Sequence, residues 1–191
     1  MPMKELMKMK HIMVDCETLG TTASAVILSI GAVRFDLEPD QISDDGFYAS
    51  VSIESNLDLG RRVQEDTLLW WLKQPAAALQ VFHEEKIELS TALEDFSDWI
   101  GTDDHCMWSN GADFDLPMLA HAYSQVGIEA PWKFWNNRCF RTYKNLPGAK
   151  NIRTEAVGVK HNALSDAHQQ AVTVQAIHKA LFGKATTKVK A

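Results

Sequence analysis

The sequence lacks the features that mark membrane and secreted proteins. No apolar run approaches the roughly 18 residues that a membrane-spanning helix needs, and the initial segment MPMKELMKMK is too charged for a signal peptide. There are only three cysteines, widely spaced and without a CxxC pair, so neither a disulfide framework nor a zinc knuckle is indicated. We therefore expect a soluble, cytoplasmic protein with reduced thiols and no membrane partner.

The chain also lacks internal repeats, low-complexity segments and long linkers rich in Gly, Ser or Pro. Its 46% hydrophobic and 23% charged residues are typical of a globular protein and exclude a disordered or collagen-like one. We expect a single domain over residues 1–191, with a core from about residue 11 to about residue 182 and with polar, mobile ends.

Basic residues are the scarcer of the two charged kinds. The 191 residues include 19 Lys and Arg against 25 Asp and Glu, which gives a formal net charge of -6. This balance argues against a protein that coats long stretches of nucleic acid through many phosphate contacts. It still allows a protein that holds a few nucleotides through bound metal ions.

The hydrophobic pattern predicts a mixture of strands and helices. Strands are expected at residues 11–15, 25–35, 47–53, 105–110 and 138–143. Helices are expected from Asp66 as N-cap to Pro75, at 76–86, from Ser90 to Gly101, at 113–127, and from about 162 to 182. Three strands followed by an alternation of helices and strands predict an α/β fold with helices around a mixed sheet.

The first predicted strand leads into two acids that are one residue apart, Asp15 and Glu17. Side chains at positions i and i+2 of a strand share a face, so these two point the same way while Cys16 points to the opposite face. Two such carboxylates repel each other unless a cation lies between them. If only this pair is considered, the simpler alternative to a bound cation is that both are solvated charges at an exposed strand edge.

Two further segments place acids near helix starts. Asp115 lies just inside the helix that follows a short strand, where the helix N-terminus stabilises an anion. On a helix Asp113 would point about 200° away from Asp115, and we expect it to be the N-terminal cap. His161 and Asp166 would lie about 140° apart on an ideal helix, so His161 is expected before or at the helix start, reaching back over the site.

The order of these motifs, DxE, then FD after a strand, then a His followed five residues later by an Asp, resembles the DEDDh superfamily of 3′-5′ exonucleases, whose fold is ribonuclease H-like. The segments TLLWWLKQPAAAL and WKFWNNRCFRTYKN resemble the phage DexA-type exonucleases and the mycobacterial RNase AS. The similarity covers roughly residues 11–182. One departure is Cys139, which stands where these relatives commonly have an Asp after the Arg that Arg138 matches.

The resemblance implies a metal-dependent mechanism. Asp15, Glu17, Asp115 and Asp166 would hold two Mg²⁺ or Mn²⁺ ions about 3.5 to 4 Å apart, with Asp15 bridging both. His161 would accept the proton of the attacking water, because the unperturbed pKa of histidine, about 6.5, lies near the working pH. The product would be a nucleoside 5′-monophosphate, released from the 3′ end of a single strand of DNA or RNA.

The substrate contacts are less specific. In the superfamily, the turn after the acid pair lies against the terminal nucleotide. Phe114, beside Asp115, could stack on a base or belong to the core. Of the adjacent Trp70 and Trp71, which would lie about 100° apart on a helix, we expect Trp71 to border the cleft, although both could be core or interface residues. Arg138 and Arg141 suit phosphate or sugar contacts, or for Arg141 a structural ion pair. The expected contact residues are Thr18, Leu19, Gly20, Trp71, Asn110, Phe114 and Arg138.

Other functions stay open at this point. A nucleic-acid-binding module without catalysis would have the same fold, although all five expected catalytic positions are filled. A zinc hydrolase is disfavoured because no HxxxH or HExxH spacing occurs. The phage relatives act on DNA and the mycobacterial one on RNA; we expect single-stranded DNA to be preferred, with some activity on RNA. A homodimer is also open, with the Trp-rich segment 66–82 as a candidate surface.

Overall fold

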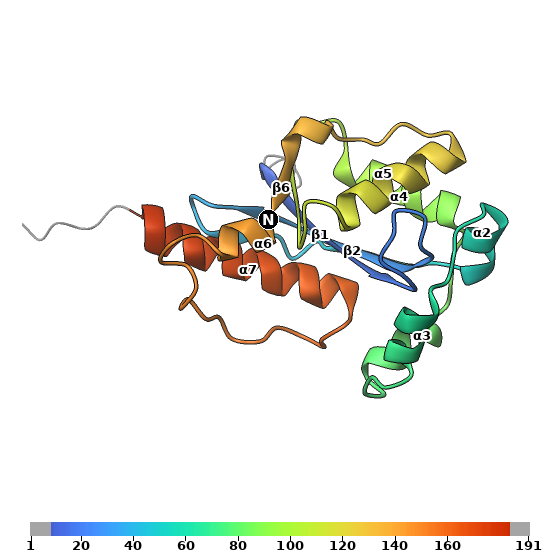
Figure 1. Ribbon diagram of the computed structural model, residues 1–191. Coiled ribbons are helices and arrows are strands. Elements are labelled where there is room, and N and C mark those ends of the chain that lie inside the picture. The colour runs from blue at the N-terminus through green and yellow to red at the C-terminus, as the bar shows by residue number, and fades with distance from the viewer. Residues whose placement is uncertain (1–8, 184–191) are drawn as a thin grey trace, which may run out of the picture.

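A mixed β-sheet with helices on both faces makes up the described part of the protein, residues 9–183 of a computed structural model (Figure 1). The strand order is β3-β2-β1-β5-β6, and β4 also pairs with β2. β1 runs antiparallel to β2 and parallel to β5, which is parallel to β6. The strands are β1 (His11–Thr18), β2 (Ile27–Asp36), β3 (Gln41–Ile42), β4 (Phe47–Ser50), β5 (Cys106–Ser109) and β6 (Asn137–Cys139). This confirms the predicted α/β fold.

Six α-helices and two short 3-10 helices surround this sheet in the described residues. The helices are α2 (Ile53–Asp58), α3 (Glu65–Trp71), α4 (Leu89–Ile100), α5 (Asp115–Val126), α6 (Phe140–Lys144), α7 (Ala163–Phe182), η1 (Ala78–Phe82) and η2 (Phe134–Asn136). None of the described helices is both long and apolar enough to cross a membrane.

Alternate residues of β1 build the core on the two sides of the sheet. Ile12, Val14 and Cys16 pack with buried residues of α4 and α5, including Phe96 and Leu119. On the other side Met13 packs with Ala167, Ala171 and Val174 of α7. Because alanine is small, α7 lies close along β1 and β2, and Figure 1 shows it crossing this face. The first turns of α7 therefore come next to the end of β1.

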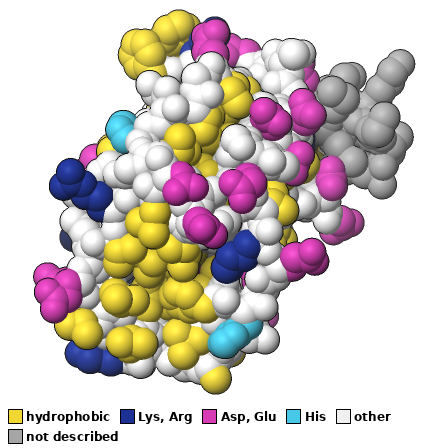
Figure 2. Space-filling view, turned by 90° about the vertical axis from the view of Figure 1, so that its right-hand side faces the viewer, with side chains coloured by type: hydrophobic (Ala, Val, Ile, Leu, Met, Phe, Trp, Pro, Cys, Tyr) yellow, Lys and Arg dark blue, Asp and Glu magenta, His cyan; other side chains and the backbone are white. Residues whose placement is uncertain are grey.

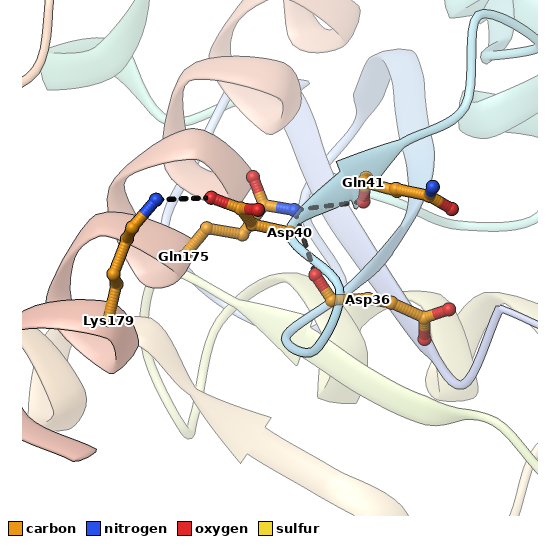
Figure 3. A network of polar contacts seen from close by, with 5 residues as sticks. All are labelled: Asp36, Asp40, Gln41, Gln175 and Lys179. Atoms are coloured by element: carbon orange, nitrogen blue, oxygen red, sulfur yellow. Dashed lines mark hydrogen bonds and ion pairs between the residues drawn. The ribbon is translucent and has the colours of Figure 1, made fainter. Parts of the chain in front are cut away.

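Polar contacts fix the far end of α7 to the turn between β2 and β3 (Figure 3). The side-chain amide of Gln175 donates to the main-chain oxygens of Asp36 and Gln41, at 2.8 Å each. Lys179 forms an ion pair with Asp40 at 3.1 Å. Both ends of the turn are thus held by one helix, which defines the position of α7 along the sheet.

Several predicted boundaries are wrong. α3 begins at Glu65 with Gln64 as N-cap, and α4 begins at Leu89 after Glu88, so neither Asp66 nor Ser90 caps a helix. The N-cap of α5 is Phe114 rather than Asp113. The carboxylate of Asp115 accepts the main-chain N–H of Cys16 on β1, and Asp113 is exposed.

The predicted helix at 76–86 is only the 3-10 helix η1, and the predicted strand at 138–143 divides into β6 and α6. The division falls at Cys139, whose sulfur caps α6 by accepting the N–H of Thr142 at 3.4 Å. α2 and β3 were not predicted. Residues 1–8 and 184–191, expected to be mobile, lie outside the described residues, whereas Met9 belongs to the core at 1% exposure.

Candidate active site

The acid pair at the end of β1 faces the first turns of α7. The side-chain amide of Gln170 donates to Oδ1 of Asp15 at 2.7 Å. Glu17 is 7% exposed and lies beside the start of the same helix. Cys16, between them, packs into the opposite core with α4 and α5. The predicted alternation of faces is therefore confirmed.

Asp115 reaches the acid pair from the other side of the sheet edge. Its side chain is 1% exposed, and Oδ1 accepts the main-chain N–H of Cys16 at 3.1 Å. The second oxygen, Oδ2, is buried and has no hydrogen-bond partner. The carboxylate is thus anchored to β1 between Asp15 and Glu17, with one oxygen left to accept a ligand.

His161 comes from the connection into α7 and Asp166 from the first turn of this helix, as expected. Asn162 caps this helix by accepting the N–H of Ser165, so His161 lies just before it. The main-chain N–H of His161 donates to Oδ2 of Asp166 at 2.8 Å. Within the described residues His161 alone, among residues other than glycine, has a positive φ, 63°. Such a backbone conformation is uncommon and often occurs where function requires a particular side-chain direction.

Three of these side chains form a compact group of potential metal ligands. Ligand atoms of Glu17, His161 and Asp166 all lie within 4.8 Å of one another. Asp15 and Asp115 are not part of this group, but they lie close enough to repel its acids. Asp166 raises the pKa of Asp15, and Asp115 raises the pKa of Glu17. The structure thus brings all four predicted metal ligands and His161 to one place.

The carboxylates of the site lie close together and repel one another. Burial, followed by repulsion from neighbouring acids, raises the pKa of Asp15 well above its ordinary value and that of Glu17 to about 8. Burial also raises the pKa of Asp115 to about 7, although backbone N–H groups lower it in part. The pKa of Asp166 is raised and that of His161 is lowered, in each case chiefly by burial. Buried carboxylates in this state are stabilised by a cation.

The adjacent tryptophans of α3 have different positions. Trp71 is 1% exposed and its indole N–H donates to the main-chain oxygen of Thr18 at 2.8 Å. Trp70 is 41% exposed, and its ring lies 5.0 Å from the His161 ring at an interplanar angle of 89°. The Trp71 ring also lies near the His161 ring, at 6.2 Å, so both tryptophans adjoin the site. Trp70 is the exposed one of the two, because the side chains leave the helix in different directions.

Trp70 belongs to an apolar surface patch over α3, which also includes Leu68, Leu69 and Leu72. Figure 2 shows hydrophobic side chains gathered on the lower part of this face, with acidic side chains above them. Apolar and acidic surface thus meet on this side of the molecule.

The other expected contacts lie around the acids with little exposed surface. Thr18, Leu19 and Gly20 are buried, and the hydroxyl of Thr18 donates to the main-chain oxygen of Gly20 at 2.7 Å. Phe114 is partly buried against the core. The side-chain oxygen of Asn110 is buried without a hydrogen-bond partner, while its main-chain oxygen accepts from Arg141 at 2.7 Å.

Arg138 is exposed, and its guanidinium donates to the main-chain oxygens of Trp135 and Asn137. It forms no ion pair within the described residues. The neighbouring Cys139 has a structural role as the cap of α6. A side-chain oxygen also suits such a cap, so an Asp at this position would be compatible with the same turn.

Two residues that hold the site were not predicted. Gln170 binds Asp15, and its spacing of four residues from Asp166 on α7 was the available signal, since residues i and i+4 share a helix face. Gly31 pairs with Asp15 across β1 and β2, and a Cβ there would lie 2.2 Å from the main chain of Ala163. No local pattern in the sequence indicates this contact.

Comparison with known proteins places the chain in a nuclease family. Residues 10–178 match the Rv2179c-like family, described as a 3′-5′ exoribonuclease domain. The chain belongs to this family. An exodeoxyribonuclease of Enterobacteria phage T4 is 25% identical over 159 residues, which cover 70% of each chain.

Solved structures share the fold of this Rv2179c-like chain. The cell-death related nuclease CRN-4 has a TM-score of 0.57 at 13% identity, covering 86% of this chain and 62% of that one. The nuclease domain of 3′hExo, a DEDDh family member bound to rAMP, has a TM-score of 0.53 at 13% identity, covering 88% and 90%. The chain thus spans less than two thirds of CRN-4. These structures show that the fold is shared with nucleases, one of them a DEDDh family member, while the family match and the phage relative support a 3′-5′ exonuclease.

Proposed function

We propose that the chain removes nucleoside 5′-monophosphates one at a time from the 3′ end of single-stranded nucleic acid, with two divalent cations as cofactors. The observation that carries this proposal is the convergence of four carboxylates and His161, from β1, α5 and the start of α7, at one end of the sheet. The whole of residues 1–191 would act as a single exonuclease domain.

The residues fit a pair of Mg²⁺ or Mn²⁺ ions. These cations prefer carboxylate oxygens, and Asp15, Glu17, Asp115 and Asp166 would hold them. The buried Oδ2 of Asp115 has no other partner, and the raised pKa values of the buried acids fall back when a cation compensates their charge. When bound, such ions neutralise the acids and the phosphodiester and stabilise the charge of the leaving oxygen.

His161 is proposed to take the proton of the attacking water. Its lowered pKa keeps the imidazole neutral at physiological pH, which is the form that accepts a proton. The N–H of its main chain on Asp166 and the Trp70 ring beside its imidazole hold its direction. Gln170 similarly orients Asp15.

Two observations point to opposite preferences for the sugar of the substrate. The family is described as an exoribonuclease domain, whereas the phage T4 relative is an exodeoxyribonuclease. We propose that both kinds of strand are shortened. The expected preference for DNA stays a prediction, with the exoribonuclease as the second candidate.

The test is digestion of 5′-labelled single-stranded DNA and RNA of one sequence, with Mg²⁺, Mn²⁺ or EDTA. The proposal expects a ladder that shortens from the 3′ end, requires metal, and disappears in Asp115→Asn. Asp113→Asn is the matched control, because Asp113 is an exposed acid two residues away. If neither strand is shortened in any metal, the catalytic proposal is wrong and the binding module takes its place.

A further inference from the structure

A hollow lies beside the acids, between α6, the segment 150–154 and the middle of α7. Its volume is about 670 Å³. The residues of interest in its lining are Phe140, Lys144, Lys150, Arg153, Gln169 and Gln170. We call it the basic groove.

The charge around the basic groove is opposite to that of the whole chain. Residues 138–160 contain six basic residues and one acid, Glu155, whereas the whole chain has 19 basic residues and 25 acids. Lys144, Lys150 and Arg153 are exposed, and within the described residues none of them forms an ion pair. Lys144 lies 5.1 Å from the centre of the Phe140 ring. No described carboxylate compensates any of the three charges, so an anion would be attracted to the hollow.

Gln170 connects the basic groove to the proposed catalytic site. Its amide N–H group donates to Asp15 at 2.7 Å, and the same side chain lines the groove. The residue is only 7% exposed, yet its side-chain oxygen has no hydrogen-bond partner. The groove therefore begins one side chain away from a predicted metal ligand.

The wall opposite α7 is held in place by hydrogen bonds. Gln169 donates to the hydroxyl of Thr154 at 2.7 Å and accepts the main-chain N–H of Val157, also at 2.7 Å. Arg153 donates to the main-chain oxygens of Lys150, at 2.5 Å, and of Ile152, at 3.0 Å. The side chain of Arg153 is thus held against the segment that carries Lys150.

We propose that the basic groove binds the phosphodiester backbone of the substrate strand on the 5′ side of the scissile bond. This inference rests on the proposed function, because it assigns the path of the same strand. A strand that ends at the acids has to leave across a molecule of net charge -6, and the groove is the cationic surface that adjoins them. Phosphate contacts of this kind position a strand without reading its sequence.

The experiment compares Lys150→Ala/Arg153→Ala with wild type on a dinucleotide and on a 12-nucleotide strand. The proposal expects KM for the long strand to rise about tenfold or more, with KM and kcat for the dinucleotide unchanged. Lys10→Ala/Lys133→Ala is the control of equal charge, because both lysines are exposed and lie outside the groove. Lys150→Arg/Arg153→Lys keeps the cations and should retain the wild-type length dependence.

Binding of a fluorescent 12-nucleotide strand, followed by anisotropy in a His161→Ala background with Mg²⁺, gives an independent measurement. Each phosphate contact to a single strand contributes about 0.7 to the slope of log affinity against log salt, so losing two lowers the slope by about 1.4. An unchanged slope together with an unchanged KM in an active enzyme overturns the groove proposal alone. If wild type cleaves nothing, the proposed function is wrong, and the slope by itself supports or overturns the groove.

Discussion

Gly31 and Ala163 touch so closely that a Cβ on Gly31 would lie 2.2 Å from the carbonyl carbon of Ala163. Gly31 pairs with Asp15 across β1 and β2, and Ala163 is the first residue of α7. The helix start that carries His161 and Asp166 is therefore placed against the acid pair by the absence of a side chain. Main chain cannot move aside as a flexible side chain does, so this position tolerates only glycine.

Gly31→Ala is expected to lower both stability and nuclease activity. The methyl group would push the start of α7 away from β1, and overpacking of a core typically costs about 1–3 kcal/mol of the free energy of unfolding, with more expected against main chain. Urea unfolding and the exonuclease assay measure the two effects. Gly46→Ala is the control: its Cβ would meet Cδ1 of Leu164, the far end of a flexible side chain on the same helix. Equal losses in the two variants would contradict the argument.

His161→Ala is expected to lower kcat by about 10² to 10⁴, the usual contribution of a general base, with little change in KM. His83→Ala, an exposed histidine, is expected to leave kcat unchanged. The measurement is steady-state hydrolysis of a short single strand at several pH values. If His161→Ala retains wild-type kcat across that range, the imidazole is not the proton acceptor.

Much of this site is encoded by patterns that are local in sequence. The alternation of strand faces placed Asp15 and Glu17 together and Cys16 in the opposite core, and helix geometry placed His161 before α7. The resemblance then supplied the expectation that Asp115 and Asp166 join them. Each of these inferences needs only a few neighbouring residues or a motif order.

Contacts between distant segments were not predictable in this way. Gln170 reaches Asp15 across 155 positions, and the approach of Gly31 to Ala163 depends on how α7 lies on the sheet. The choice between Trp70 and Trp71 depends on the rotation of α3 against the core. A sequence shows that two adjacent tryptophans diverge, but only packing decides which one turns inward.

Truncation of Trp71 is expected to lower stability, whereas truncation of Trp70 is expected to lower activity. Trp71→Ala removes a buried ring and the hydrogen bond to Thr18, so the free energy of unfolding should fall by about 3–5 kcal/mol. Trp70→Ala should change stability little but reduce kcat/KM, because the ring borders His161. Trp70→Phe keeps an aromatic face and should recover most of the activity. Urea unfolding and kinetics of all three separate the roles; unchanged kinetics in folded Trp70→Ala would exclude the ring from the site.

Removal of divalent metal is expected to make stability strongly dependent on pH. The pKa of Glu17 is raised from 4.5 to about 8 in the folded protein, so between these values the unfolded chain has released a proton that the folded one retains. The unfolded state then binds fewer protons, and the free energy of unfolding falls as pH rises through this window. Asp15 and Asp115 act in the same direction, because the pKa values of both are also raised.

In EDTA, thermal or urea unfolding should therefore show stability falling from pH 5 to pH 9, by about 3 kcal/mol or more for shifts of this size. Mg²⁺ or Mn²⁺ should restore stability most at the high end, where the acids are ionised and able to bind it. Asp115→Asn removes one buried carboxyl group, so it should be more stable than wild type at pH 8 in EDTA and gain less from metal. Stability that is flat with pH in EDTA would contradict the raised pKa values of these acids. Stability raised equally by metal in wild type and Asp115→Asn would contradict the assignment of Asp115 as a metal ligand.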